Sequence, residues 1–139
     1  MRISSDHSAD YLTIDRAEPS DGDLLVIVEV RCRGFAGRID TWIARPAWLE
    51  FCDQLTRLEQ RRQGQASVES MSPNELRLTV QSTDRAGHMA VEGCLGYRGV
   101  HGEVRLSFSP MPFDSSTLLA LVREARAIGH DSTFTAGDE

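Results

Sequence analysis

Apolar and polar side chains alternate along most of this chain. The clearest alternation runs from Leu24 to Cys32, where apolar residues take every second position and Glu29 and Arg31 stand between them. A period of two is typical of a strand with one buried face. Similar patterns predict strands over residues 11–15, 35–43, 66–70, 76–80, 89–95 and 103–108.

Two segments change to the period of a helix. Pro46 suits a first helical turn, because the N–H that proline lacks has no partner there. The apolar stripe that follows consists of Trp48, Phe51, Cys52, Leu55 and Leu58. Gly64 is the predicted C-terminal cap. Asp114 is a suitable N-cap for a second helix, whose apolar side holds Leu118, Leu119, Val122, Ala125 and Ile128, with Gly129 at its end.

These elements follow the order β-β-β-α-β-β-β-β-α. Helices and strands do not alternate, which argues against a parallel doubly wound sheet. Short turns between successive strands favour antiparallel pairing. We therefore expect an α+β fold: a single twisted antiparallel sheet with both helices packed on one face. The length of 139 residues suits a single domain, 1–139. We expect an ordered core of about 10–129, with loose residues 1–9 and a loose tail, 130–139.

Four glycines stand three residues apart at Gly93, Gly96, Gly99 and Gly102. A dinucleotide-binding fingerprint needs a different spacing and a helix directly after it, whereas a strand follows here. An odd spacing also sends successive glycines to opposite faces of a strand. The run therefore predicts a bent or bulged hairpin, with a ligand-contacting loop as the alternative.

The formal net charge of −6 disfavours nucleic acid and anionic membrane surfaces as partners. It suits a basic partner protein, and it also suits plain solubility. All fifteen basic residues are arginine. Without lysine the chain cannot form a pyridoxal-phosphate Schiff base or a Walker-type phosphate loop, so both enzyme classes are excluded.

The predicted location is the cytoplasm. No apolar run approaches the ~20 residues that cross a bilayer, and the segment from Met1 to His7 lacks the apolar core of a secretory signal. Cys32, Cys52 and Cys94 are far apart in the sequence, which predicts reduced thiols.

No motif predicts catalysis, a cofactor or a metal ion. The four histidines form no HxxxH or HExxH pair. The alternative hypothesis is a ligand-binding or catalytic domain centred on the glycine hairpin. It requires His88 and His101, on strands flanking that hairpin, to meet near Cys94 and Tyr97.

The candidate protein-binding surface has two parts. Trp42, Arg38 and Arg45 form the first, since tryptophan and arginine are enriched at binding hot spots; packing at the core or a helix edge is the other interpretation of Trp42. Tyr97, Arg98, His88 and His101 form the second. We expect the partner to be another protein, and one possibility is a second copy that pairs as a homodimer through an exposed edge strand.

The whole order of elements also resembles a known family. The segments that carry the resemblance are Trp48-Leu49-Glu50-Phe51-Cys52-Asp53-Gln54-Leu55, Gln63-Gly64-Gln65-Ala66, Glu75-Leu76-Arg77-Leu78-Thr79-Val80, Gly87-His88-Met89-Ala90-Val91, Leu106-Ser107-Phe108 and Phe113-Asp114-Ser115-Ser116-Thr117-Leu118. Over residues 10 to 128 they are similar to the WapI-type bacterial immunity proteins and related small bacterial families. The resemblance implies a non-enzymatic cytoplasmic protein that neutralises a toxin domain, and it transfers no catalytic residue.

Overall fold

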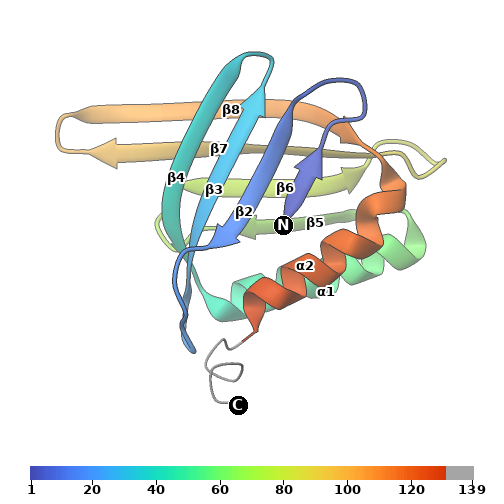
Figure 1. Cartoon of the computed structure of the whole chain (residues 1–139), viewed down its shortest axis with the longest axis horizontal. Helices are drawn as coiled ribbons and strands as arrows, with labels where there is room; N and C mark the ends of the chain where they lie inside the picture. Colours follow the sequence, from blue (N-terminus) through green and yellow to red (C-terminus); the bar gives the residue numbers. More distant parts are fainter. Residues whose placement is uncertain (131–139) are drawn as a thin grey trace.

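The computed structural model describes residues 1–130. Eight strands and two α-helices make up this part of the chain (Figure 1). In chain order they are β1 (Arg2–Ser4), β2 (Tyr11–Arg16), β3 (Leu24–Cys32), β4 (Phe35–Ile43), α1 (Arg45–Arg61), β5 (Gln65–Glu69), β6 (Leu76–Ser82), β7 (Met89–Gly99), β8 (Gly102–Phe113) and α2 (Leu118–Gly129).

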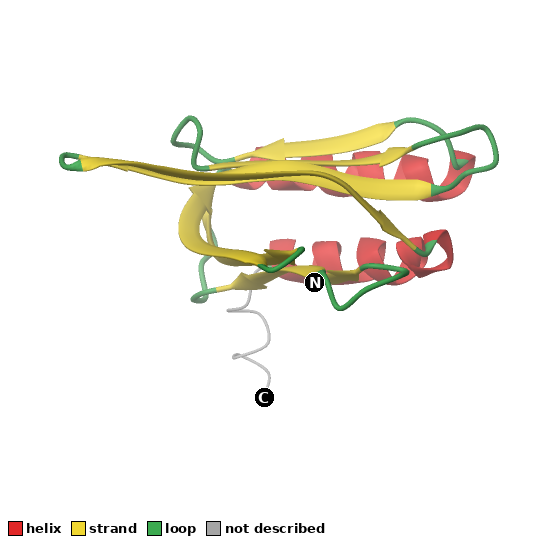
Figure 2. Cartoon of the chain, turned by 90° about the horizontal axis from the view of Figure 1, so that it is seen from above, coloured by secondary structure: helices red, strands yellow, loops and turns green. Residues whose placement is uncertain are grey.

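The strands form two antiparallel sheets, which confirms the α+β class and corrects the expected single sheet. The expected order is corrected as well, since four strands precede α1 instead of three, and the two helices lie in different layers instead of on one face of one sheet (Figure 2). Sheet A has the order β1-β2-β3-β4 and sheet B the order β5-β6-β7-β8. The two sheets lie in separate layers, and their strands run in different directions (Figures 1 and 2). Alternation shows that each strand has one buried face, but not what covers that face. Here each sheet largely covers the other.

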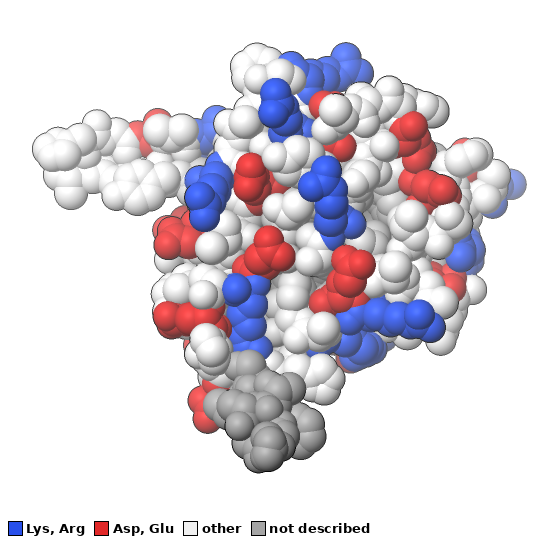
Figure 3. All heavy atoms as spheres, viewed as in Figure 1, with Lys and Arg blue, Asp and Glu red and all other residues white. Residues whose placement is uncertain are grey.

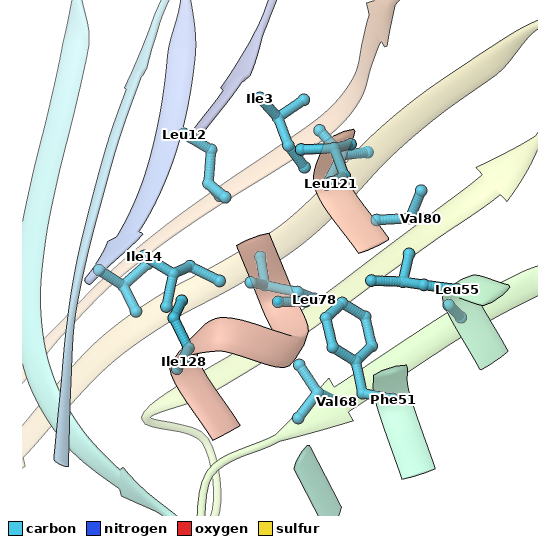
Figure 4. Close-up of a cluster of buried hydrophobic side chains, with 14 of the residues drawn as sticks. Ile3, Leu12, Ile14, Phe51, Leu55, Val68, Leu78, Val80, Leu121 and Ile128 are labelled. Atoms are coloured by element: carbon cyan, nitrogen blue, oxygen red, sulfur yellow. The ribbon is translucent and has the colours of Figure 1, made fainter. Parts of the chain in front are cut away.

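One continuous core fills the space between the sheets and the helices. Its members come from both sheets and both helices (Figure 4). They include Ile3, Leu12, Ile14, Phe51, Leu55, Val68, Leu78, Val80, Leu121 and Ile128. α1 packs against β5 and against α2. The Trp48 indole N–H donates to the Ala125 carbonyl over 2.8 Å, which links the two helices and confirms Trp48 as a core residue.

A polar contact also joins the sheets. Thr41 on β4 is 2% exposed, and its hydroxyl donates to the Glu75 carboxylate over 2.7 Å. Near it, the Met71 amide donates to the Trp42 carbonyl over 2.8 Å. Buried polar groups cost free energy unless they are hydrogen-bonded. The Thr41–Glu75 bond therefore fixes how β4 sits against the segment that leads into β6.

The ends of the chain differ from the sequence prediction in one respect. Residues 1–9 were expected to be loose, but β1 pairs with β2 and buries Ile3 to 2% exposure. Met1 and Ile3 are the only large apolar residues in residues 1–9, too few to establish a period, so the alternation could not reveal this strand. Residues 131–139 of the expected tail lie outside the described residues.

The helix ends are partly as predicted. Pro46 lies in the first turn of α1. The C-cap of that helix is Arg62, in the left-handed conformation with φ 59°, instead of Gly64. Asp114 is an N-cap as predicted, and its carboxylate accepts from the Ser116 amide. It begins a short 3₁₀ turn, Ser115–Thr117, that leads into α2.

The glycine run forms the predicted hairpin. β7 passes through three of the glycines, and residues 100 and 101 make the turn before Gly102 opens β8. The ladder shifts between Val91 and Gly93, so it carries the expected irregularity. The run is an ordinary antiparallel pair rather than a phosphate-binding loop.

Gly93 marks a close approach of two backbones. A Cβ at this position would lie 2.3 Å from the Arg77 carbonyl oxygen. No side chain fits there without moving β6 away from β7. Gly22 is a matched control, since its Cβ would meet only the Ser20 hydroxyl at 3.9 Å.

We therefore predict that Gly93→Ala destabilises the fold by about 1–3 kcal/mol, the usual cost of forcing atoms into a packed site. Gly22→Ala should change the free energy of unfolding by less than about 0.5 kcal/mol. Urea unfolding followed by circular dichroism measures both. Equal midpoints for Gly93→Ala and the parent chain would contradict this account of the glycine.

Candidate protein-binding surface

The end of the β7–β8 hairpin projects past sheet A as an arm (Figures 1 and 2). β7 and β8 have 11 and 12 residues, whereas β4, which lies across them, has 9. Sheet A covers the hairpin as far as Leu106, whose side chain lies 3.3 Å from the Cβ position of Gly37 on β4. We define the arm as residues 96–105.

The arm carries the core-facing side of sheet B out into solvent. Leu95 is opposite Leu106, and both face sheet A. Two residues further along each strand, Tyr97 is opposite Val104 on that same face. There Tyr97 is 64% exposed and Val104 is 70% exposed. The face is therefore apolar along its whole length and covered only at its base.

The arm's tip adds another apolar group. Val100 occupies the turn and is 96% exposed. The Tyr97 ring lies over Gly99, where a Cβ would come within 2.7 Å of the ring. An aromatic side chain that covers a glycine on the same strand holds that stretch of strand in shape. The arm is thus an ordered apolar projection.

A groove adjoins the base of the arm. It has a volume of about 530 Å³ and lies between the β3–β4 turn and β8. Phe35 forms one rim and is 72% exposed. Apolar atoms of Cys32, Leu106, Phe108 and Pro110 form much of the wall, with Arg33 and Arg105 beside them. The groove continues the apolar face of the arm.

The arm lacks the acidic character of the whole chain. Its charged side chains are Arg98, Glu103 and Arg105, with His101 at the turn. Arg105 pairs with Glu103 over 2.9 Å. In Figure 3 the projection is mostly uncharged, while positive and negative groups are interspersed over the rest of the visible face. Recognition at the arm therefore depends on apolar contact and shape more than on charge.

The structure brings together only some of the residues proposed from sequence. Tyr97, Arg98 and His101 all lie on the arm. Arg38 and Trp42 alternate with the inward-facing Thr41 and Ile43, so they lie on the outer face of sheet A. Trp42 is 44% exposed, so it is not a core residue.

Arg45 has a structural role. Its guanidinium donates to the carbonyls of Ser20 and Gly22, at 2.9 and 2.7 Å, and to that of Gly129. These bonds tie the loop before β3 to the end of α2. Three carbonyl partners within the fold leave the Arg45 side chain committed to its own chain.

The alternative site centred on the hairpin does not form. His88 precedes β7 and His101 follows it, so the whole of β7 separates them, about 35 Å at the usual rise per residue. Cys94 lies midway and on the opposite face from Leu95 and Tyr97. Within residues 1–130 no group of three metal-ligating side chains gathers.

Burial determines the protonation state of the other two cysteines, Cys32 and Cys52. Burial raises the pKa of the Cys52 thiol to about 11, well above its usual value. Burial and the neighbouring Asp10 carboxylate also raise the pKa of Cys32. Both thiols therefore stay protonated at neutral pH, as expected of packing residues.

His88 belongs to a turn. Its Nδ1 lies 2.6 Å from Asp84 Oδ2, and the same carboxylate accepts from the amides of Ala86 and His88. These hydrogen bonds lower the pKa of Asp84, and the bond with the His88 side chain has the largest effect. The pair closes the loop between β6 and β7.

We predict that Asp84 titrates below its ordinary value near 3.8. A depressed pKa in the folded state adds stability above the unfolded value, and that stability is lost as the pH falls through the folded value. Carboxyl carbon chemical shifts measured by NMR report this titration directly. In His88→Ala the midpoint should move up toward the ordinary value; an unchanged midpoint would show that His88 does not hold the carboxylate.

The model of the WapI-like immunity protein family matches residues 4–131. This chain belongs to that family. The match spans nearly the whole chain and takes in strands of both sheets and both helices, so the family identity covers the arm as well as the core. Comparison with curated proteins and with solved structures found no match. Among the described residues, no helix is long and apolar enough to cross a membrane.

Sequence reasoning missed three residues of this surface: Phe35, Val100 and Val104. The alternation identifies Phe35 and Val104 as apolar strand positions, but it cannot show that the opposing sheet ends before it reaches them. The exposure of Val100 could have been predicted from the sequence, because an apolar residue in a hairpin turn between Gly99 and Gly102 is remote from the core.

Proposed function

We propose that this WapI-like protein neutralises a toxin domain by binding it, and that the arm and the adjoining groove are the binding surface. The observation that carries the proposal is the uncovered apolar face of sheet B. Exposed contiguous apolar surface on a soluble domain typically marks an interaction site. Family membership supplies the class of partner.

The chemistry of the surface suits a protein partner. Tyr97 and Phe35 are rigid aromatic side chains, 64% and 72% exposed, and such residues are enriched among binding hot spots. The groove between Phe35 and β8 can receive an apolar side chain. Tyr97 and Arg98 fit this surface, and His101 lies in the turn at its tip. The mechanism we propose is occlusion of the toxin, with no chemical step by this chain.

Co-expression with a toxin domain encoded by a neighbouring gene would test the proposal. We predict that Tyr97→Ala and Phe35→Ala each weaken the complex by at least about tenfold, as hot-spot truncations do. Leu119→Ala is the matched control, since Leu119 is 46% exposed but lies on α2. Affinity by calorimetry and growth protection in cells are the two measurements.

Two outcomes would contradict the proposal. Absence of any complex with the toxin domain would remove the immunity function itself. A complex that tolerates the Tyr97 and Phe35 substitutions but is lost in Trp42→Ala would instead place the interface on the outer face of sheet A.

A further inference from the structure

The outer edge of β8 is protected over only part of its length. Towards its C-terminal end, Pro110 and Pro112 interrupt the row of backbone donors, and Ser5 forms a bridge to Phe113. Over residues 103–108 there is no proline, and no strand of the described chain pairs with that side. Proteins usually protect such edges, because an unpaired edge accepts another strand.

The ladder shows which backbone groups face outward. The Gly96 amide donates to the Glu75 carbonyl over 2.9 Å, on the side away from β8. In an antiparallel pair, opposite residues direct their backbone groups either toward each other or both away. Arg105 is opposite Gly96, so its N–H and C=O point to the free edge. Glu103 and Ser107, two residues to either side, do the same.

We propose that this edge pairs with the same edge of a second copy of the chain, antiparallel about a two-fold axis at Val104. In this register Glu103 is opposite Arg105 of the second copy, and Arg105 is opposite its Glu103. The two neighbouring registers would oppose Glu103 to Glu103 or Arg105 to Arg105, and like charges directly opposite each other are destabilising. The charge pattern therefore selects one self-complementary register, as an isologous interface requires.

The same register provides an apolar partner for the tip. It brings Val100 of one copy level with Phe108 of the other. Val100 is 96% exposed in the monomer. Phe108 lines the groove of about 530 Å³ together with Phe35 and Leu106. Each tip would thus lie beside the groove of the other copy, and the two Val104 side chains would lie next to each other at the axis.

Adjacent antiparallel strands present the same face, so the apolar faces of the two arms would join on one side of the dimer. The proposal concerns the backbone edge of β8 and does not depend on the proposed toxin. It is tested on the full chain alone, and its failure leaves the toxin test unaffected.

Sedimentation equilibrium over a range of concentrations measures self-association. We expect a monomer–dimer equilibrium for the parent chain. Glu103→Arg and Arg105→Glu should each weaken it by about tenfold, since each change replaces two attractive pairs with two repulsive ones. The double variant E103R/R105E should restore association to within about threefold, because the exchanged charges are again complementary.

Disulfide trapping tests the register itself. At the axis, residue 104 of one chain is opposite residue 104 of the second chain. The two form a non-hydrogen-bonded pair, in which the Cα atoms are about 4.5 Å apart. This separation suits a disulfide. In a C32S/C94S background, with Cys52 buried, Val104→Cys should form the disulfide-linked dimer at least about tenfold faster than Val100→Cys. Val100 is the more exposed of the two, so random collision would favour it.

A parent chain that stays monomeric at every concentration would overturn the proposal. So would equal trapping rates for the two cysteine variants, or a double charge exchange that fails to restore association. Protection of the β8 edge from hydrogen exchange only in the presence of the toxin domain would assign that edge to a strand of the toxin instead.

Discussion

The fold depends on the burial of two apolar sheet faces against each other. Sheet A supplies Leu12, Val28 and Val30, and sheet B supplies Leu78 and Val91, all essentially inaccessible to solvent. Burying apolar area contributes roughly 25 cal/mol per Å², so the facing sheets and the helices beside them dominate the stability. The Thr41–Glu75 hydrogen bond fixes the position of one sheet on the other without adding much to that total.

The same constraint produces the candidate site. Burial requires each face to be covered, but β7 and β8 are longer than β4, which covers them. Beyond Leu106 the apolar face continues uncovered. Tyr97 and Val104 therefore continue the apolar face of the sheet but are exposed to solvent, because no second layer covers them. A surface of this kind costs solubility and adds little to folding, which is why we assign it to binding.

Much of the fold could be predicted from the sequence, because alternation and helical stripes report burial locally. The strand from Leu24 to Cys32 and the apolar stripe containing Trp48 are found where their periods place them. The packing of one sheet on another depends on residues far apart in the sequence, so a local pattern does not reveal it. Each strand shows one apolar face whether a helix or a second sheet covers it, so the single-sheet prediction was wrong although most of the strands were correctly identified.

The candidate site was harder to predict for the same reason. The sequence identifies Tyr97 and Arg98 as bend residues of the glycine hairpin. The alternative hypothesis required His88 to meet His101, but a whole strand separates them. The sequence does not give the length of the hairpin: Gly93 and Gly96 lie inside β7, and the strand continues to Gly99, so His88 and His101 stand at its two ends. The C-cap of α1 was also mispredicted. Glycine is the preferred residue at this position, but the C-cap here is Arg62, whose backbone N–H donates to the Leu58 carbonyl.

The central claim is that the arm, and not the body of the domain, is the functional surface. Replacing residues 96–105 by Asn-Gly tests it most directly. Leu95 and Leu106 are a hydrogen-bonded pair by the alternation of the ladder, and a two-residue turn suits such a pair. We predict a variant that keeps both sheets and unfolds cooperatively but no longer protects cells from the toxin domain. Full protection by the shortened protein would contradict the account.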